Sequence, residues 1–308
     1  MKSTMNKTSN ALRISVLGTA LIALGACKSE TFQEPQKLGG RWVSSSTLNL
    51  GHDTYMNYCM QCHGVNGDGL GPAAQGTYPA PRNFKQGAFK FASVGAGELP
   101  TDEDLKHTIR NGLRGTPMLP WDISDERLDA VVQYIKTFSD VWKEGEPGTP
   151  LEITADPYGP SRAEEAIAQG KKVYHGIAQC YTCHPAYATL EEINAASLET
   201  TGNGVTSIRE GAHLSTLLDS SYGHKFMPPD YTKDMIKTGS SPEQIYKTIG
   251  PGINGTAMPA WKGLLTSTGS FEESEKNQWA LAYYVSYLQS LKFNAEARKT
   301  FFEHLQAR

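Results

Sequence analysis

Two five-residue segments constrain this 308-residue sequence more than any other feature. They contain four of its five cysteines and read CMQCH at 59–63 and CYTCH at 180–184. Each follows a glycine and a tyrosine spaced four residues apart, which are Gly51 with Tyr55 and Gly170 with Tyr174. A chain of this length has room for two domains of ordinary size, so the repetition predicts two diverged copies of one structural unit.

Further matches follow both segments. Two loops centred on methionine read GLRGTPMLPW (112–121) and GINGTAMPAW (252–261), and they are identical at five of ten positions. Before each loop we expect a short helix, capped by Thr101 in the first copy and by Ser241 in the second, with Pro242 at its first position. After each loop we expect an amphipathic helix, with apolar residues 128, 131, 132, 135 and 138 matched by 281, 284, 285, 288 and 291 at an offset of 153.

These patterns predict an all-α fold of two tandem helical domains, because only helical periodicity is evident. A break rich in Pro and Gly separates the copies. The expected segments are a signal peptide at 1–27, a tether at 28–45, domain 1 at 46–143, a linker at 144–163, domain 2 at 164–292 and a helical tail at 293–308.

The N-terminus predicts export. Its first 27 residues carry three basic residues and no acid, followed by an apolar run, as in a secretory signal peptide. The run ends in Leu24-Gly25-Ala26-Cys27, which resembles a lipobox, so we expect a lipid on Cys27 and a place on the periplasmic side of a bacterial membrane. Removing these residues leaves 26 basic and 32 acidic side chains, a net charge of −6, which argues against a nucleic-acid partner.

The C-x-x-C-H pattern is typical of covalent haem attachment. On one helical turn Cys59, Cys62 and His63 project to the same side, so both thiols can reach the haem vinyl groups while the imidazole reaches the iron. Cys180, Cys183 and His184 repeat the arrangement. Three alternatives compete with haem attachment. A dithiol redox site needs a strand-helix-strand setting that neither copy shows. A zinc site shared by both cysteine pairs would join distant copies and leave the repeated histidine unexplained, and a disulfide within C-x-x-C closes too small a loop to stabilise the fold much.

The second axial ligand decides between carrier and catalyst, because an iron held on both faces has no vacant position for a substrate. Met118 and Met258 are the candidates, since a thioether is a soft ligand that raises the reduction potential. In the second copy Met227, His213 and His224 are rivals for the position of Met258.

Both copies resemble class I cytochrome c domains, on the Gly/aromatic helix, the C-x-x-C-H segment, the Met loop and the final helix. The first copy, with PRNF at 81–84 and LPTDEDL at 99–105, is similar to a branch found with membrane respiratory complexes. The resemblance implies two covalent haem c groups, one-electron transfer between respiratory-chain partners such as a membrane complex or terminal reductase, and no small-molecule substrate. A two-haem peroxidase or a thiosulfate-oxidising haem enzyme is the alternative.

Overall fold

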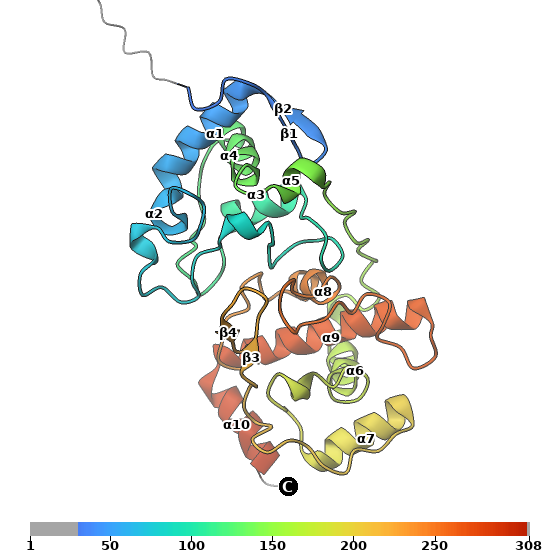
Figure 1. Cartoon of the computed structure of the whole chain (residues 1–308). Helices are drawn as coiled ribbons and strands as arrows, with labels where there is room; N and C mark the ends of the chain where they lie inside the picture. The colour runs from blue at the N-terminus through green and yellow to red at the C-terminus, as the bar shows by residue number, and fades with distance from the viewer. Residues whose placement is uncertain (1–29, 307–308) are drawn as a thin grey trace, which may run out of the picture. The chain divides into compact units, whose positions relative to one another are not determined.

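The computed structural model describes residues 30–306, and these residues are mostly helical (Figure 1). From Phe32 onward the described chain packs as one unit. The predicted signal peptide and the predicted lipid site, Cys27, lie outside the described residues. Among residues 30–306, no helix combines the length and the apolar character needed to cross a membrane.

The first copy consists of a hairpin, helices and short 3₁₀ turns. In chain order its elements are β1 Gln36–Leu38, β2 Arg41–Val43, α1 Ser45–Tyr58, α2 Met60–His63, η1 Pro72–Ala74, η2 Phe84–Gln86, α3 Asp102–Asn111, α4 Asp125–Lys136 and α5 Val141–Glu144.

The second copy repeats the order of the main helices, with α6, α8 and α9 in the places of α1, α3 and α4, and has further elements inserted. Its elements are η3 Pro160–Arg162, α6 Ala163–His175, η4 Cys180–Thr182, α7 Leu190–Thr201, β3 Leu218–Asp219, β4 Lys225–Phe226, α8 Pro242–Ile249, α9 Phe271–Lys292 and α10 Ala295–Gln306. The helix α7 and the hairpin β3–β4 fall within the stretch that separates the second cysteine motif from the rest of its copy, and sequence periodicity does not predict them.

The two copies are built on the same helix crossing. Helix α1 packs on α4, and α6 packs on α9. A Cβ atom added to Gly51 would lie 2.1 Å from the Ala130 carbonyl oxygen, and one added to Gly170 would lie 2.1 Å from that of Ala280. Only glycine permits so close an approach of two helix backbones. The glycine that opens each copy therefore sets how closely the two helices pack.

These contacts correct the predicted register between the copies. Ala130 corresponds to Ala280, and Tyr134 and Tyr284 lie beside the two glycines in the same way, so α4 and α9 match at an offset of 150 rather than 153. A shift of three residues keeps a helical stripe on nearly the same face, which is why the apolar pattern alone gave the wrong register.

The predicted tether is wrong for residues 36–43. These residues form the antiparallel hairpin β1–β2, in which Leu38 and Val43 are buried. Gly39 and Gly40 both have positive φ angles of 59° and 81°. That backbone is the one a two-residue hairpin turn requires, so the glycine pair that indicated a flexible tether is a turn instead.

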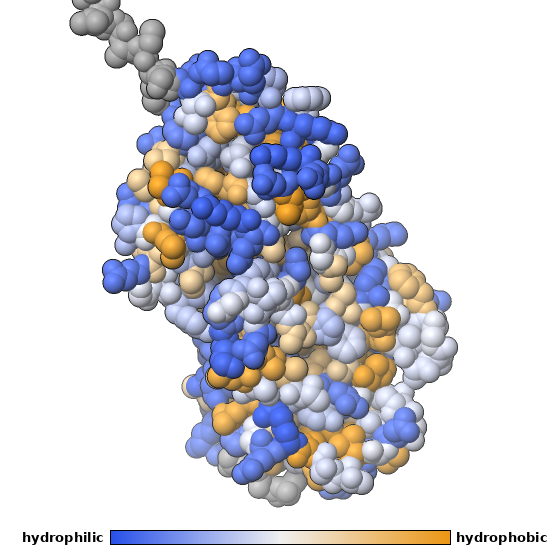
Figure 2. All heavy atoms as spheres, in the orientation of Figure 1, coloured by the Kyte–Doolittle hydropathy of each residue, from blue (hydrophilic) through white to orange (hydrophobic). Residues whose placement is uncertain are grey.

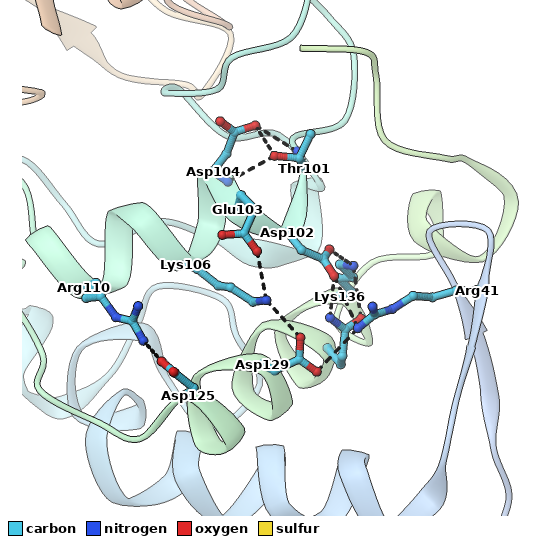
Figure 3. A network of polar contacts seen from close by, with 11 residues as sticks. Arg41, Thr101, Asp102, Glu103, Asp104, Lys106, Arg110, Asp125, Asp129 and Lys136 are labelled. Atoms are coloured by element: carbon cyan, nitrogen blue, oxygen red, sulfur yellow. Dashed lines mark hydrogen bonds and ion pairs between the residues drawn. The ribbon is translucent and has the colours of Figure 1, made fainter.

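The hairpin is held by an ionic network at the N-terminus of α3 (Figure 3). The Asp102 carboxylate pairs with Arg41 of β2 at 3.3 Å and with the buried Lys136 ammonium of α4. The Gln133 amide of α4 donates to the same carboxylate at 2.8 Å. Three elements that are far apart in the sequence therefore share one carboxylate.

The helices α3 and α8 begin as the sequence predicts. Thr101 and Ser241 each accept a bond from the backbone N–H three residues later, in a capping box. Pro242 occupies the first position of α8. On the face in Figure 2, hydrophobic residues form several small groups separated by hydrophilic ones.

Candidate functional site

The first cysteine motif follows α1 directly and forms a single helical turn. The Cys62 and His63 backbone N–H groups both donate to the Cys59 carbonyl, at 3.2 and 3.0 Å. Both thiols and the imidazole line one cavity of about 190 Å³. Met118 lines the same cavity, so the structure brings the four predicted site residues of the first copy together.

The His63 ring is fixed in orientation. Its Nδ1 donates to the Arg82 carbonyl oxygen at 3.0 Å, and its ring stacks on Phe84 with the centroids 4.5 Å apart. Burial lowers the pKa of His63. With the proton on Nδ1, the neutral imidazole keeps the Nε2 lone pair for a metal ion.

The second motif repeats the arrangement. Cys183 and His184 donate their backbone N–H groups to the Cys180 carbonyl at 3.2 and 2.9 Å. The His184 Nδ1 donates to the Pro229 carbonyl at 3.0 Å, and burial lowers the pKa of this histidine to about 4. Its ring stacks on Tyr231, with the centroids 4.8 Å apart.

Sequence reasoning missed these two anchoring loops as a matched pair. Their segments read PRNF at 81–84 and PPDY at 228–231. In both copies a proline is followed by the residue whose carbonyl accepts the hydrogen bond from the histidine, and an aromatic ring comes two residues later. The Tyr231 hydroxyl lies 3.3 Å from His184 Nε2, a polar contact that Phe84 cannot make. The two sites therefore differ beside the histidine nitrogen.

The two Met loops share one conformation. In the first, the Leu113 N–H donates to the Met118 carbonyl at 2.8 Å and the Met118 N–H donates to the Thr116 hydroxyl at 3.1 Å. In the second, the Ile253 N–H donates to the Met258 carbonyl and the Met258 N–H donates to the Thr256 hydroxyl, each at 3.2 Å. The shared glycine and threonine of the loops thus present both methionines on the same backbone.

Each Met loop begins with a glycine that lies close to the methionine carbonyl. Gly112 has a φ of 64°, and a Cβ there would lie 2.6 Å from the Met118 carbonyl oxygen. Gly252 has a φ of 72°, and its Cβ would lie 2.7 Å from the Met258 carbonyl oxygen. Glycine therefore recurs at the first position of both Met loops because a side chain there would strain the backbone and collide with the methionine carbonyl.

The three rivals of Met258 differ in burial. The Met227 side chain is 59% exposed, and His213 is also exposed. His224 is half-buried, with its ring stacked on Tyr222 at 6.2 Å. Met258 packs against the core of the second copy. Its role as a ligand stays a prediction.

The first cysteine of each motif has a raised thiol pKa. Burial, followed by the charge of Cys62, raises the pKa of Cys59 to about 12, and burial raises that of Cys180 to about 12 as well. A dithiol redox site needs a lowered thiol pKa, so this environment argues against that alternative. The described residues include no group of three or more His, Cys, Asp or Glu side chains placed to hold a metal ion, so the two cysteine pairs do not meet in one such cluster.

Comparison with known proteins gives two similarities. Residues 46–135 match the family model described as cytochrome c oxidase, cbb3-type, subunit III. A chain of the reducing HAO-like protein complex of Kuenenia stuttgartiensis is 31% identical, with a TM-score of 0.60, and the alignment covers 78% of this chain and 95% of that one. A search of curated proteins gave no match.

Proposed function

Because the chain belongs to the c-type cytochromes, we propose that it carries single electrons between protein partners, with one covalently attached haem c in each copy. The observation that carries the proposal is the duplication of one complete ligand set. Each copy has a C-x-x-C-H turn, a carbonyl that fixes the histidine and a hydrogen-bonded Met loop.

The first cavity fits a haem by the chemistry of its lining. Two thiols, a histidine whose Nδ1 is bonded to a backbone carbonyl, and a thioether line the same space. Apolar and aromatic side chains complete the walls, among them Phe84, Leu105, Ile109, Trp121 and Ile135. A bound haem supplies a one-electron couple at its iron.

The chain's own residues would hold and tune that couple. Cys59 and Cys62 would form the thioether links, and the Arg82 carbonyl, which accepts the bond from Nδ1, would hold the tautomer and plane of His63. Met118 would be presented by a loop in which the Leu113 N–H bonds to the Met118 carbonyl and the Met118 N–H bonds to the Thr116 hydroxyl. Cys180, Cys183, His184 and Met258 would have the same roles in the second copy.

Carrier function is the expectation if a histidine and a methionine both hold each iron. Such an iron would offer no position to a substrate. A haem enzyme is the second candidate, because the similar chain belongs to an HAO-like complex and because Tyr231 places a hydroxyl beside His184 in one site only.

The setting we propose is the periplasmic side of a bacterial membrane, with a lipid on Cys27 and redox proteins as partners. The support is the lipobox-like sequence that ends the apolar run, and the origin of the similar chain in a protein complex. A membrane respiratory complex or a terminal reductase fits the match of residues 46–135 to a cytochrome oxidase subunit family.

Haem content and a redox titration test the proposal. Purified protein from a host that attaches haem c should carry two haems per chain and titrate in two one-electron steps. The Cys59→Ala/Cys62→Ala variant should retain one haem and one step, and Cys180→Ala/Cys183→Ala should retain the other. One haem per wild-type chain would contradict the assignment of one haem to each copy.

A further inference from the structure

The cavity of the first copy has cationic side chains in its lining. Arg82, Lys90 and Lys237 line it together with the ligand residues, all three are half-buried, and none of the described lining residues is acidic. Within residues 30–306 none of these three cations forms an ion pair. Arg82 and Lys90 lie over the Tyr222 ring, and the charges of Arg82 and Lys237 act on Lys90, so the cavity lining carries positive charge without an acidic partner in the same lining.

Lys237 reaches this cavity from the second copy. Its carbonyl accepts the Arg114 N–H of the first Met loop at 3.1 Å. The Lys90 carbonyl accepts the Asn254 N–H of the second Met loop at 3.2 Å. Lys90 and Lys237 are thus each bound through the main chain to the Met loop of the other copy.

The two bonds are equivalent within the repeat. Arg114 and Asn254 are both the third residue of their Met loops, and Lys90 and Lys237 both lie eight residues after the carbonyl that anchors the histidine. The copies therefore contact each other reciprocally, as the two subunits of a symmetric dimer do. One chain contributes both halves of that contact.

The positive charges lie close enough to disfavour one another. Burial, followed by the charges of Arg82 and Lys237, lowers the pKa of Lys90 to about 8. The Arg82 guanidinium lies 3.8 Å from the centre of the Tyr222 ring and the Lys90 ammonium lies 5.3 Å from it, which offsets part of the cost. His224 stacks on the same tyrosine, and Asp234 is the acid that acts on Lys237. An anion bound among the three cations would relieve the repulsion.

We propose that Arg82, Lys90 and Lys237 bind the two propionate carboxylates of the haem in the first copy, so that the second copy completes the haem site of the first. This rests on the proposed function, which places a haem in that cavity. Haem carries two carboxylates, and a guanidinium with two ammonium groups supplies the donors and the charge to bind them. The contact between the copies then helps to set the potential of the first haem.

The test is Lys237→Met in the full-length protein with haem attached. Methionine keeps the length of the side chain and removes the charge. Loss of a cation beside the haem stabilises the ferric form, so the midpoint potential of the first haem should fall, and Met118→Ala identifies which potential that is. The propionate bending band in the resonance Raman spectrum should shift as well, because one carboxylate loses its donor.

Lys85→Met is the matched control. Lys85 lies in the same region of the chain, is exposed, and does not line the cavity. Loss of the Lys85 charge should leave the midpoint potential and the propionate Raman band nearly unchanged, because an exposed charge is screened by salt. Lys237→Arg keeps the charge and should retain most of the wild-type potential. If Lys237→Met folds poorly, Lys90→Met provides the second variant with the same expected direction.

Three results would overturn the proposal. The first is a shift in the midpoint potential of the first haem that is equal in Lys237→Met and Lys85→Met. The second is an unchanged Raman band in Lys237→Met. The third is a wild-type potential that responds to added inorganic phosphate and loses that response in Lys237→Met, which would assign the cluster to a free anion. Haem content is measured in the same samples. If the first copy carries no haem, the proposed function itself has failed.

Discussion

Replacing Gly170 by alanine should destabilise the second copy by opening its central helix crossing. The new Cβ would lie 2.1 Å from the Ala280 carbonyl oxygen and 2.6 Å from the Tyr284 Cβ, whereas ordinary contacts begin at 3.4 Å. Both obstacles belong to α9, so α6 and α9 must separate by about 1 Å, which forfeits a quarter to a half of each contact's attraction. Overpacking of this kind costs about 3 kcal/mol, against a gain of about 1 kcal/mol in helix propensity. We expect a net loss of about 2 kcal/mol.

Urea unfolding followed by far-ultraviolet circular dichroism measures this loss. Ala168→Gly is the control, because Ala168 is exposed in the same helix and its replacement changes propensity without touching α9. The control should cost about 1 kcal/mol. Gly51→Ala repeats the test in the first copy, where the Ala130 carbonyl is equally close. A Gly170→Ala variant as stable as the wild type, or more stable, would refute the argument from close approach.

Three further outcomes are expected. Met118→Ala should lower one midpoint potential, because loss of the thioether favours ferric iron. It should also open one face of that iron, so that carbon monoxide binds in optical titrations. An unchanged potential would show that Met118 is no ligand. Burial lowers the pKa of His175 to about 4. Between pH 6.5 and 4 the unfolded chain therefore binds a proton at His175 that the folded chain does not bind. The free energy of unfolding should fall by about 3 kcal/mol as the pH drops from above 6.5 to 4. His175→Gln should weaken this dependence of the unfolding free energy on pH, measured by urea unfolding at each pH. A dependence as steep as that of the wild type would show that His175 is not its cause. Cys27→Ser should move the protein from the membrane to the soluble fraction with both haems intact, and retention at the membrane would argue against a lipid anchor.

The parts of the fold that depend on local chemistry could be predicted from the sequence. Thr101 and Ser241 cap their helices because a hydroxyl before an amphipathic run has few other uses. The turns at Cys59 and Cys180 follow from the three- and four-residue spacing of their motifs. In the first copy this spacing, together with the repeated Met loop, also anticipates that His63 and Met118 line one cavity.

The errors arose where one pattern has two physical interpretations. An apolar helical stripe looks similar after a shift of three residues, and only the contact of Gly170 with Ala280 fixes the register. A Gly-Gly pair suits a flexible tether and a tight turn equally well, and burial of Leu38 and Val43 decides between them at 36–43.

Long-range contacts gave no signal in the sequence. Lys237 meets the first cavity through a contact that joins loops more than 100 residues apart, and no periodicity marks it. The aromatic partners of the two histidines could have been found, because the anchoring segments at 81–84 and 228–231 both pair proline with an aromatic ring. An inserted helix and hairpin separate the second of these segments from its cysteine motif and obscured the match.

Carbon monoxide titration of the reduced wild-type protein tests the central claim most directly. If Met118 and Met258 close the second face of both irons, the optical spectrum should not change with carbon monoxide, while Met118→Ala and Met258→Ala should each bind one equivalent. Stoichiometric binding by the wild type at either haem would show an open iron and contradict the carrier assignment.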